Sequence, residues 1–272
     1  MAIKDILLHL DNSPSCPSRI EFAVNLALSH GAHLKGLYVL THPYYASRHD
    51  KGEADQVEAV KAQFLDKTGQ AGISAEWLYV NWSVVGVGVS EVVDLYAYYS
   101  DLLIVGQPDL ASRNAGTPDD LPERLGLGIG RPLLVVPYAG IFPSVINRVM
   151  VAWKTGRESS RVIHDSLPIL RKAAHVSIVT VGAQGKQDDS VERDARSVCT
   201  YLARHGITAT HDWILTTSNF PIGDVLLNHA CEQTMDLLAM GAFAPTRRGA
   251  FVLGPIARHL MAHMTVPVLI SH

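Results

Sequence analysis

DLLIVG at residues 101–106 and its near copy DLLAMG at residues 236–241 decide the fold of this chain of 272 residues. The two stretches lie 135 residues apart, and RPLLVVP (131–137) corresponds to VPVLISH (266–272) at the same offset, with no gap between them. Two matches in one register seldom arise by chance. Internal similarity of this kind indicates that one structural unit is present twice.

The beginnings of the two copies also correspond. KDILLHLDNS (4–13) matches NRVMVAWKTG (147–156), and in both copies a Ser-Arg pair and an amphipathic stretch follow. The short segment YAGIFPS (138–144) separates the copies. We therefore predict two domains, residues 1–141 and residues 142–272.

Each copy contains five short apolar runs separated by stretches of helical periodicity. Such runs are typical of strands that helices bury on both faces, as in a parallel sheet. One helical stretch, RIEFAVNLALSHG (19–31), is expected to end at Gly31. The alternation predicts an α/β fold with two tandem doubly wound five-stranded parallel sheets, Rossmann-like or flavodoxin-like. The predicted strands are IKDILLHL, HLKGLYVL, AEWLYV, DLLIVG and PLLVVP, then RVMVAW, HVSIVTVG, THDWIL, DLLAMG and PVLISH.

The composition argues against several classes of partner. A formal net charge of -3 and a pI near 6.5 provide no basic field that would attract nucleic acid or anionic membranes. No apolar run reaches the roughly 18–20 residues that cross a bilayer, and Lys4 and Asp5 interrupt the apolar start. The three cysteines (16, 199 and 231) form no Cys-x-x-Cys pair, which fits a reducing compartment. We expect a cytoplasmic protein with no nucleic-acid or membrane partner.

The most informative loop follows the fourth predicted strand of the second copy. Ligands of open α/β sheets bind beyond the carboxyl ends of the strands, where helix N-termini point outward. The spacing here is Gly241, two residues, Ala244, nine residues, Gly254 and then Pro255. In these residues, and in the order of elements in both copies, the sequence resembles the universal stress protein family in its tandem two-domain form. Nucleotide-binding members of that family carry Gly-x2-Gly-x9-Gly followed by Ser, Thr or Gly.

This sequence keeps only part of that pattern. Glycines let backbone N–H groups approach a phosphate, and the start of a helix stabilises the anion. Ala244 adds a methyl group where the family has its second glycine, and Pro255 lacks an N–H, although proline suits the first position of a helix. Arg247, Arg248 and Arg258 either neutralise phosphate charge or are ordinary surface charges. Both interpretations stay open.

The corresponding loop of the first copy carries acids instead. Gly106 is kept, but Asp109 takes the place of the second glycine, and Asp119 and Asp120 stand opposite Gly254 and Pro255. An aspartate at a helix start is expected to cap the N–H groups with its own carboxylate and to repel a second anion. We therefore predict that the first copy is structural, with a degenerate nucleotide loop.

The resemblance also implies residues beside the base and ribose. The family's acid after the first strand and valine in the second correspond to Asp11 and Val39 in the first copy, and to Lys154 and Val181 in the second. Lys154 donates hydrogen bonds but accepts none, which alters base preference. Asp11 is equally consistent with capping the turn that follows it. The predicted cofactor-binding residues are Lys154, Val181, Met240, Gly241, Ala244, Gly254, Pro255, Ile256 and Asp11.

The sequence contains no Gly-x-Ser-x-Gly, His-Glu-x-x-His or Walker A motif, so we predict no catalytic or metal-binding residue. The resemblance implies a non-catalytic stress-response protein that binds ATP or another adenine nucleotide, with Mg²⁺ accompanying it, in the second copy. It also implies a homodimer, since family members associate through the last strand of a domain. Two alternatives stay open: an interaction protein that has lost nucleotide binding, and a slow ATPase.

Overall fold

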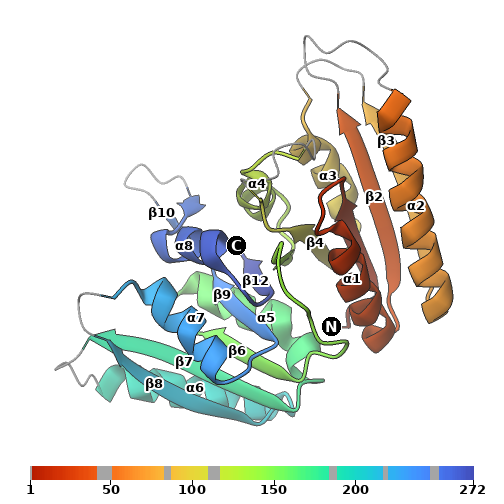
Figure 1. Cartoon of the computed structure of the whole chain (residues 1–272). Helices are drawn as coiled ribbons and strands as arrows, with labels where there is room; N and C mark the ends of the chain where they lie inside the picture. Colours follow the sequence, from red (N-terminus) through yellow and green to blue (C-terminus); the bar gives the residue numbers. More distant parts are fainter. Residues whose placement is uncertain are drawn as a thin grey trace. The chain divides into compact units, whose positions relative to one another are not determined.

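The computed structural model describes residues 2–41, 51–82, 87–109, 117–183, 189–216, 220–245 and 251–272. They form two compact units, which we call the first unit (residues 2–145) and the second unit (residues 146–272). Each unit is a parallel sheet with helices on both faces (Figure 1).

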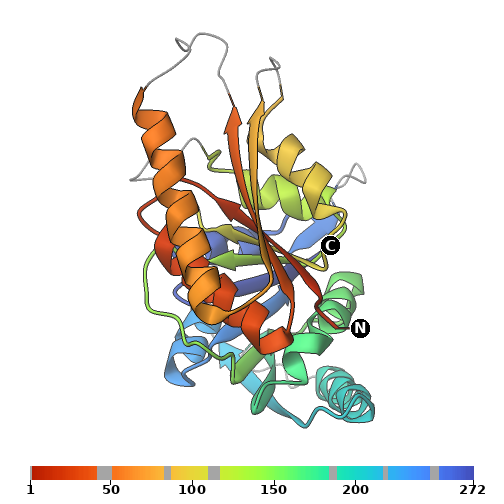
Figure 2. The same cartoon turned by 90° about the vertical axis from the view of Figure 1, so that its right-hand side faces the viewer.

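The first unit has the strand order β3-β2-β1-β4-β5, and all of its strand pairs are parallel. Helices α1 and α2 cover one face of this sheet, and α3 and α4 cover the other (Figures 1 and 2). Its elements are β1 (Asp5–Leu10), α1 (Cys16–His30), β2 (His33–Thr41), α2 (Lys51–Ala71), β3 (Ala75–Trp82), α3 (Val89–Ala97), β4 (Leu102–Gly106), α4 (Leu121–Gly128) and β5 (Leu133–Val136).

The second unit repeats this arrangement with the order β8-β7-β6-β9-β12, again all parallel. Helices α5 and α6 cover one face, and α7 and α8 cover the other (Figure 1). Its elements are β6 (Arg148–Ala152), α5 (Arg157–Leu170), β7 (His175–Ala183), α6 (Asp189–Arg204), β8 (Ala209–Thr216), α7 (Ile222–Glu232), β9 (Leu237–Gly241), β10 (Phe243–Pro245), β11 (Phe251–Leu253), α8 (Pro255–His263) and β12 (Val268–Ser271).

The apolar runs form central strands because both of their faces are covered. In β4 and β9 the first four residues are all buried, which continuous apolar runs allow and alternating ones do not. Helix α1 ends where the sequence predicted, since Gly31 adopts the left-handed conformation (φ 57°) and its N–H bonds back to the last turn. The predicted fold class, two tandem doubly wound five-stranded parallel sheets, is confirmed.

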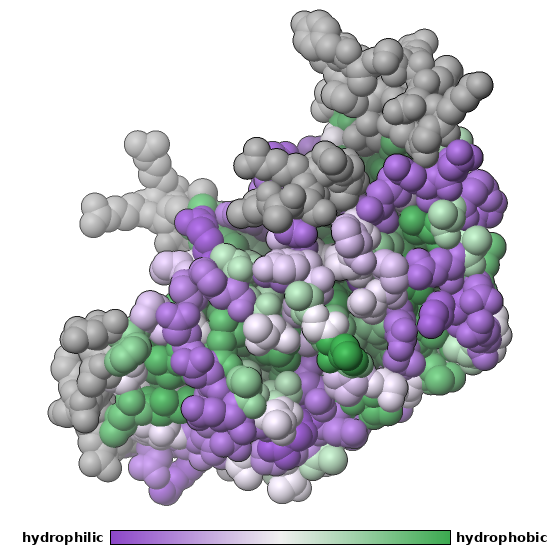
Figure 3. Space-filling model, viewed as in Figure 1, coloured by the Kyte–Doolittle hydropathy of each residue, from purple (hydrophilic) through white to green (hydrophobic). Residues whose placement is uncertain are grey.

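Among the helices in the described part of the chain, none is both long enough and hydrophobic enough to span a bilayer. On the face seen in Figure 3, hydrophilic and hydrophobic residues are interspersed in each unit.

Candidate functional site

In the second unit the strand order reverses between β6 and β9, which is where open α/β sheets bind ligands. The two strands lie in register here, with Ala152 beside Met240. Helix α5 approaches this edge closely. A Cβ atom on Gly241 would lie 2.7 Å from Cβ of Glu158 and 2.9 Å from the backbone nitrogen of Ser159. Glycine is therefore required at residue 241 by packing of the α5 N-terminus, independently of any ligand.

The N-terminus of α8 reaches the same edge. Gly254 is the N-cap residue, Pro255 is the first residue of the helix, and the Gly254 N–H donates to the carbonyl oxygen of Ala242 at 2.8 Å. Among the described residues, no side chain caps α8, and none caps α5, whose N-cap residue is Gly156. Two uncapped helix N-termini thus meet beside Gly241, and each directs the positive end of its dipole toward this edge.

The structure brings most of the predicted cofactor-binding residues together. Lys154 follows β6 and is exposed, and Val181 is half-buried in β7, the neighbouring strand. Asp11 is the exception, because it belongs to the first unit. The other eight residues of the set lie at the carboxyl ends of β6, β7 and β9, in β10 and at the start of α8. They are Lys154, Val181, Met240, Gly241, Ala244, Gly254, Pro255 and Ile256.

The glycine-spaced loop itself forms a short hairpin that the sequence did not predict. Strand β10 pairs with β11 in antiparallel fashion, and Ala244 lies opposite Val252. The Gly254 N–H already bonds within the loop, and Pro255 has no N–H, so two donors of the family's pattern are missing. Arg247 and Arg248 lie outside the described residues.

The charges around this edge are mixed. Lys154 and Arg157 are exposed, and the guanidinium carbon of Arg157 lies 5.5 Å from the centroid of the Phe251 ring, in a cation–π arrangement. Arg258 directs Nη2 to the carbonyl oxygen of Leu253 at 3.5 Å. Glu158, in the first turn of α5, places a carboxylate near the same edge. Backbone dipoles, Lys154 and Arg157 would therefore stabilise an anion at this edge, and the Glu158 carboxylate would repel it.

We expect Gly241→Ala to lower the free energy of unfolding of the second unit by about 1–3 kcal/mol, because the α5 backbone must move away from the added methyl group. Urea unfolding would measure the change. Gly254→Ser is the matched control: a Cβ there meets only the Ala242 carbonyl oxygen, at 3.4 Å, and serine suits an N-cap, so the effect should stay within about 0.5 kcal/mol. Equal effects of the two substitutions would contradict the close approach of α5.

In the first unit an arginine side chain fills the space at the corresponding edge of the sheet, over Gly106. A Cβ atom on Gly106 would collide with Nη1 of Arg19, a residue of α1 that is only 2% exposed. The guanidinium is held by Asp11, with 2.7 Å between Arg19 Nη2 and Asp11 Oδ1. Asp11 also accepts hydrogen bonds from the Ser13 N–H, at 3.0 Å, and from the Thr117 hydroxyl, at 3.3 Å. In this arrangement Asp11 holds Arg19 and the turn after β1.

Burial and charge together set the protonation of this cluster. Burial by itself raises the pKa of the Asp11 carboxyl, but Arg19, with smaller contributions from His9 and Ser13, outweighs it and holds the pKa below its usual range. Burial lowers the pKa of His9 from 6.5 to about 4; Arg19 also lowers it, while Asp11, at 4.0 Å, opposes the shift. At neutral pH the core of the first unit therefore contains a neutral imidazole beside an ion pair.

The predicted capping of α4 by its aspartates is wrong. Asp120 is the N-cap residue, but its side chain makes no capping hydrogen bond; it accepts from Arg124 Nε at 2.7 Å instead. The (i, i+4) ion pair on the exposed helix surface competes for the carboxylate.

Arg19 was not predicted as a site residue. The repeated Ser-Arg pair was its sequence signal, but only the arginine of the first copy is buried: Arg161, its counterpart, is exposed.

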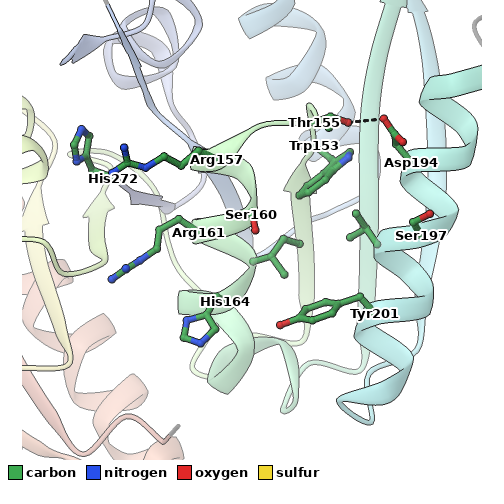
Figure 4. A pocket seen from close by; sticks show the side chains of 12 residues that line it. Trp153, Thr155, Arg157, Ser160, Arg161, His164, Asp194, Ser197, Tyr201 and His272 are labelled. Atoms are coloured by element: carbon green, nitrogen blue, oxygen red, sulfur yellow. Dashed lines mark hydrogen bonds between the residues drawn. The ribbon is translucent and has the colours of Figure 1, made fainter. Parts of the chain in front are cut away.

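A cavity of about 700 Å³ lies in the second unit between α5 and α6 (Figure 4). Its floor contains Trp153, Ile163 and Val198. None of the predicted cofactor-binding residues lines it, although Trp153 and Thr155 flank Lys154. The full lining is Trp153, Thr155, Arg157, Ser160, Arg161, Ile163, His164, Asp194, Ser197, Val198, Tyr201 and His272.

No protein-family model matches this chain, and no curated protein matches its sequence. Solved structures do match. A universal stress protein from Archaeoglobus fulgidus superposes with a TM-score of 0.76 at 16% identity, over 98% of this chain and 97% of that chain. A functionally unknown protein from Pseudomonas aeruginosa superposes with a TM-score of 0.62 at 15% identity, over 99% of this chain and 92% of that chain.

At this level of identity the likeness concerns the fold and transfers no ligand or activity. The alignments span nearly all of both chains, so they include both copies of the repeat. The predicted resemblance is therefore confirmed for the fold: this chain has the fold of a tandem universal stress protein.

Proposed function

We propose that this chain is a non-catalytic universal stress protein of the stress response that binds ATP or another adenine nucleotide in its second domain. In this proposal residues 1–141 form a domain with a degenerate loop, and residues 142–272 form the nucleotide domain. The observation that carries the proposal is the meeting of two uncapped helix N-termini, those of α5 and α8, beside Gly241. In the first unit Arg19 occupies the corresponding place.

The proposed roles follow from the places of the residues. Val181 and Met240 border the base, and Lys154 donates to the base or to a phosphate. Gly241 and Ala244 line the path of the phosphates, and Pro255 and Gly254 set the start of α8. The Ile256 N–H, at the second position of α8, donates to a phosphate oxygen, and Mg²⁺ accompanies a di- or triphosphate.

A second candidate is an interaction protein that has lost nucleotide binding. The observation that favours it is the hydrogen bond from the Gly254 N–H to Ala242, which removes a phosphate donor in addition to the one that Pro255 lacks. This protein would act through its surfaces and through association with a second copy.

Thermal unfolding with and without millimolar ATP and Mg²⁺ tests the proposal. A nucleotide present at 100 times its Kd should stabilise the second unit by about 2.7 kcal/mol and raise its melting temperature. Gly254→Asp should abolish the increase, because the new carboxylate caps α8 and repels phosphate. Aspartate is a good N-cap residue, so this variant should melt no lower than the natural chain when nucleotide is absent.

Two controls sharpen this test. Gly254→Asn adds nearly the same volume without the charge and should keep more of the ATP-induced increase than Gly254→Asp. Asp119→Gly, at the exposed start of α4 in the first unit, should leave the increase unchanged. If ATP does not raise the melting temperature of the natural chain, the interaction protein is favoured. Phosphate release above the blank would contradict the non-catalytic assignment and favour a slow ATPase.

Further expectations belong to the same proposal. We expect a cytoplasmic homodimer that binds neither nucleic acid nor membranes, consistent with the net charge of -3. Sedimentation at several protein concentrations would measure the oligomeric state.

A further inference from the structure

The cavity between α5 and α6 carries an inference about a second site, which shares Arg157 with the surroundings of the proposed nucleotide site but none of the predicted cofactor-binding residues. Its volume, about 700 Å³, is in the range of pockets that bind small organic molecules. Figure 4 shows Trp153 between the two helices, with Tyr201 further along the cavity. Buried Ile163 and Val198 complete an apolar floor. A flat apolar group fits a floor of this kind, because it can stack on the partly exposed indole of Trp153, while Ile163 and Val198 are already buried and add little further desolvation.

The floor contains an unused hydrogen-bond donor. Trp153 Nε1 is buried and has no acceptor among the described residues. Buried indole N–H groups usually have a partner, since a donor without one loses its hydrogen bond to water and gains none in return. A ligand ring that lies over this N–H would give it an N–H···π contact.

The charges of the rim favour an anion on the α5 side. Arg157 and Arg161 project from the same side of α5, Arg157 toward His272 (Figure 4). Arg161 is engaged by Asp165 at 2.8 Å, whereas no carboxylate of the described residues forms an ion pair with Arg157. On the opposite rim Asp194 accepts a hydrogen bond from the Thr155 hydroxyl at 2.7 Å. An acidic group would therefore be drawn toward Arg157 and away from Asp194.

We propose that this cavity binds an aromatic carboxylate in which a short flexible chain joins the ring to the acid. The ring lies on Trp153 between α5 and α6, and the chain passes over the N-terminal end of α5, which begins at Arg157, to bring the carboxylate to the guanidinium of that residue.

The probe for the test is 1-pyrenebutyrate, compared with the uncharged 1-pyrenebutanol. The chain has four tryptophans, so ¹⁵N-labelled indole groups give four resonances, and Trp153→Phe identifies the one of interest. Pyrenebutyrate should shift the Trp153 resonance. Arg157→Gln should weaken pyrenebutyrate binding about tenfold, as expected for loss of one charge-assisted contact, and should leave pyrenebutanol binding unchanged.

Two variants serve as controls. Arg196→Gln makes the same change on α6, where Arg196 pairs with Glu192 outside the cavity, and should not alter binding. Ser197→Tyr places a ring across the mouth of the cavity from an exposed position and should abolish binding without affecting the fold. If Trp153→Phe fails to fold, Ser197→Tyr still reports on the site.

Three results would overturn the proposal: no shift of the Trp153 resonance, unaltered pyrenebutyrate affinity in Arg157→Gln, or equal affinities for the acid and the alcohol. Gly254→Asp should leave pyrenebutyrate binding intact, so the failure of this site and the failure of the proposed nucleotide site are distinguishable.

Discussion

Arg19→Ala is expected to lower the free energy of unfolding of the first unit by about 3–5 kcal/mol, because it leaves the Asp11 carboxylate buried without its cation. Ser13 and Thr117 still donate to Asp11, but neither supplies a charge. The substitution also opens a space above Gly106 that the guanidinium now fills. Hydrogen exchange of the first unit's amides would measure the loss separately from the second unit.

Arg161→Ala is the matched control, since Arg161 occupies the corresponding Ser-Arg pair of the second copy. Its side chain is 47% exposed, although that of its partner Asp165 is only 9% exposed, so the ion pair is partly solvated and its removal should lower stability by about 1–2 kcal/mol, less than Arg19→Ala does. Similar losses for both substitutions would show that the buried ion pair is not a main support of the first unit.

His9 should make the first unit less stable in mild acid. Its pKa is about 4 in the folded chain and 6.5 in the unfolded chain, so between these values the unfolded state binds the extra proton. Stability is then complete above about pH 6.5 and declines as the pH falls toward 4, by about 3 kcal/mol in total. Asp11 and Arg19, the charged groups nearest to His9, keep their charges in this window.

The contribution of His9 can be isolated with His9→Gln, which keeps a polar side chain and removes the titration. The other twelve histidines titrate in both proteins, so the difference between the two stability–pH curves reports on His9. That difference should grow as the pH falls from 6.5 to 4 and stay constant above 6.5. Parallel curves throughout this range would contradict a neutral buried imidazole.

The architecture could be predicted because repetition and periodicity are properties of the chain itself. DLLIVG and DLLAMG became the equivalent strands β4 and β9, each with four consecutive buried residues. The end of α1 at Gly31 followed from the left-handed conformation that glycine adopts without penalty.

The candidate site was predicted less completely, because its details depend on contacts between distant residues. Strands β10 and β11 have only three residues each, so their pairing leaves a weak signal in the sequence. The same hairpin brings the Gly254 N–H to the carbonyl oxygen of Ala242. The capping predicted for Asp120 was wrong, since Arg124 competes for the same carboxylate.

The sequence alone determined that this protein has two copies of one parallel-sheet unit and that the two copies differ in their loops. Tertiary structure decided which of two similar arginines is buried. Arg19 lies over Gly106 and is neutralised by Asp11, whereas Arg161 remains at the surface. The physical reason is that a buried cation requires an acid and an open space above a glycine at the same point, and folding brings these together from residues 11, 19 and 106.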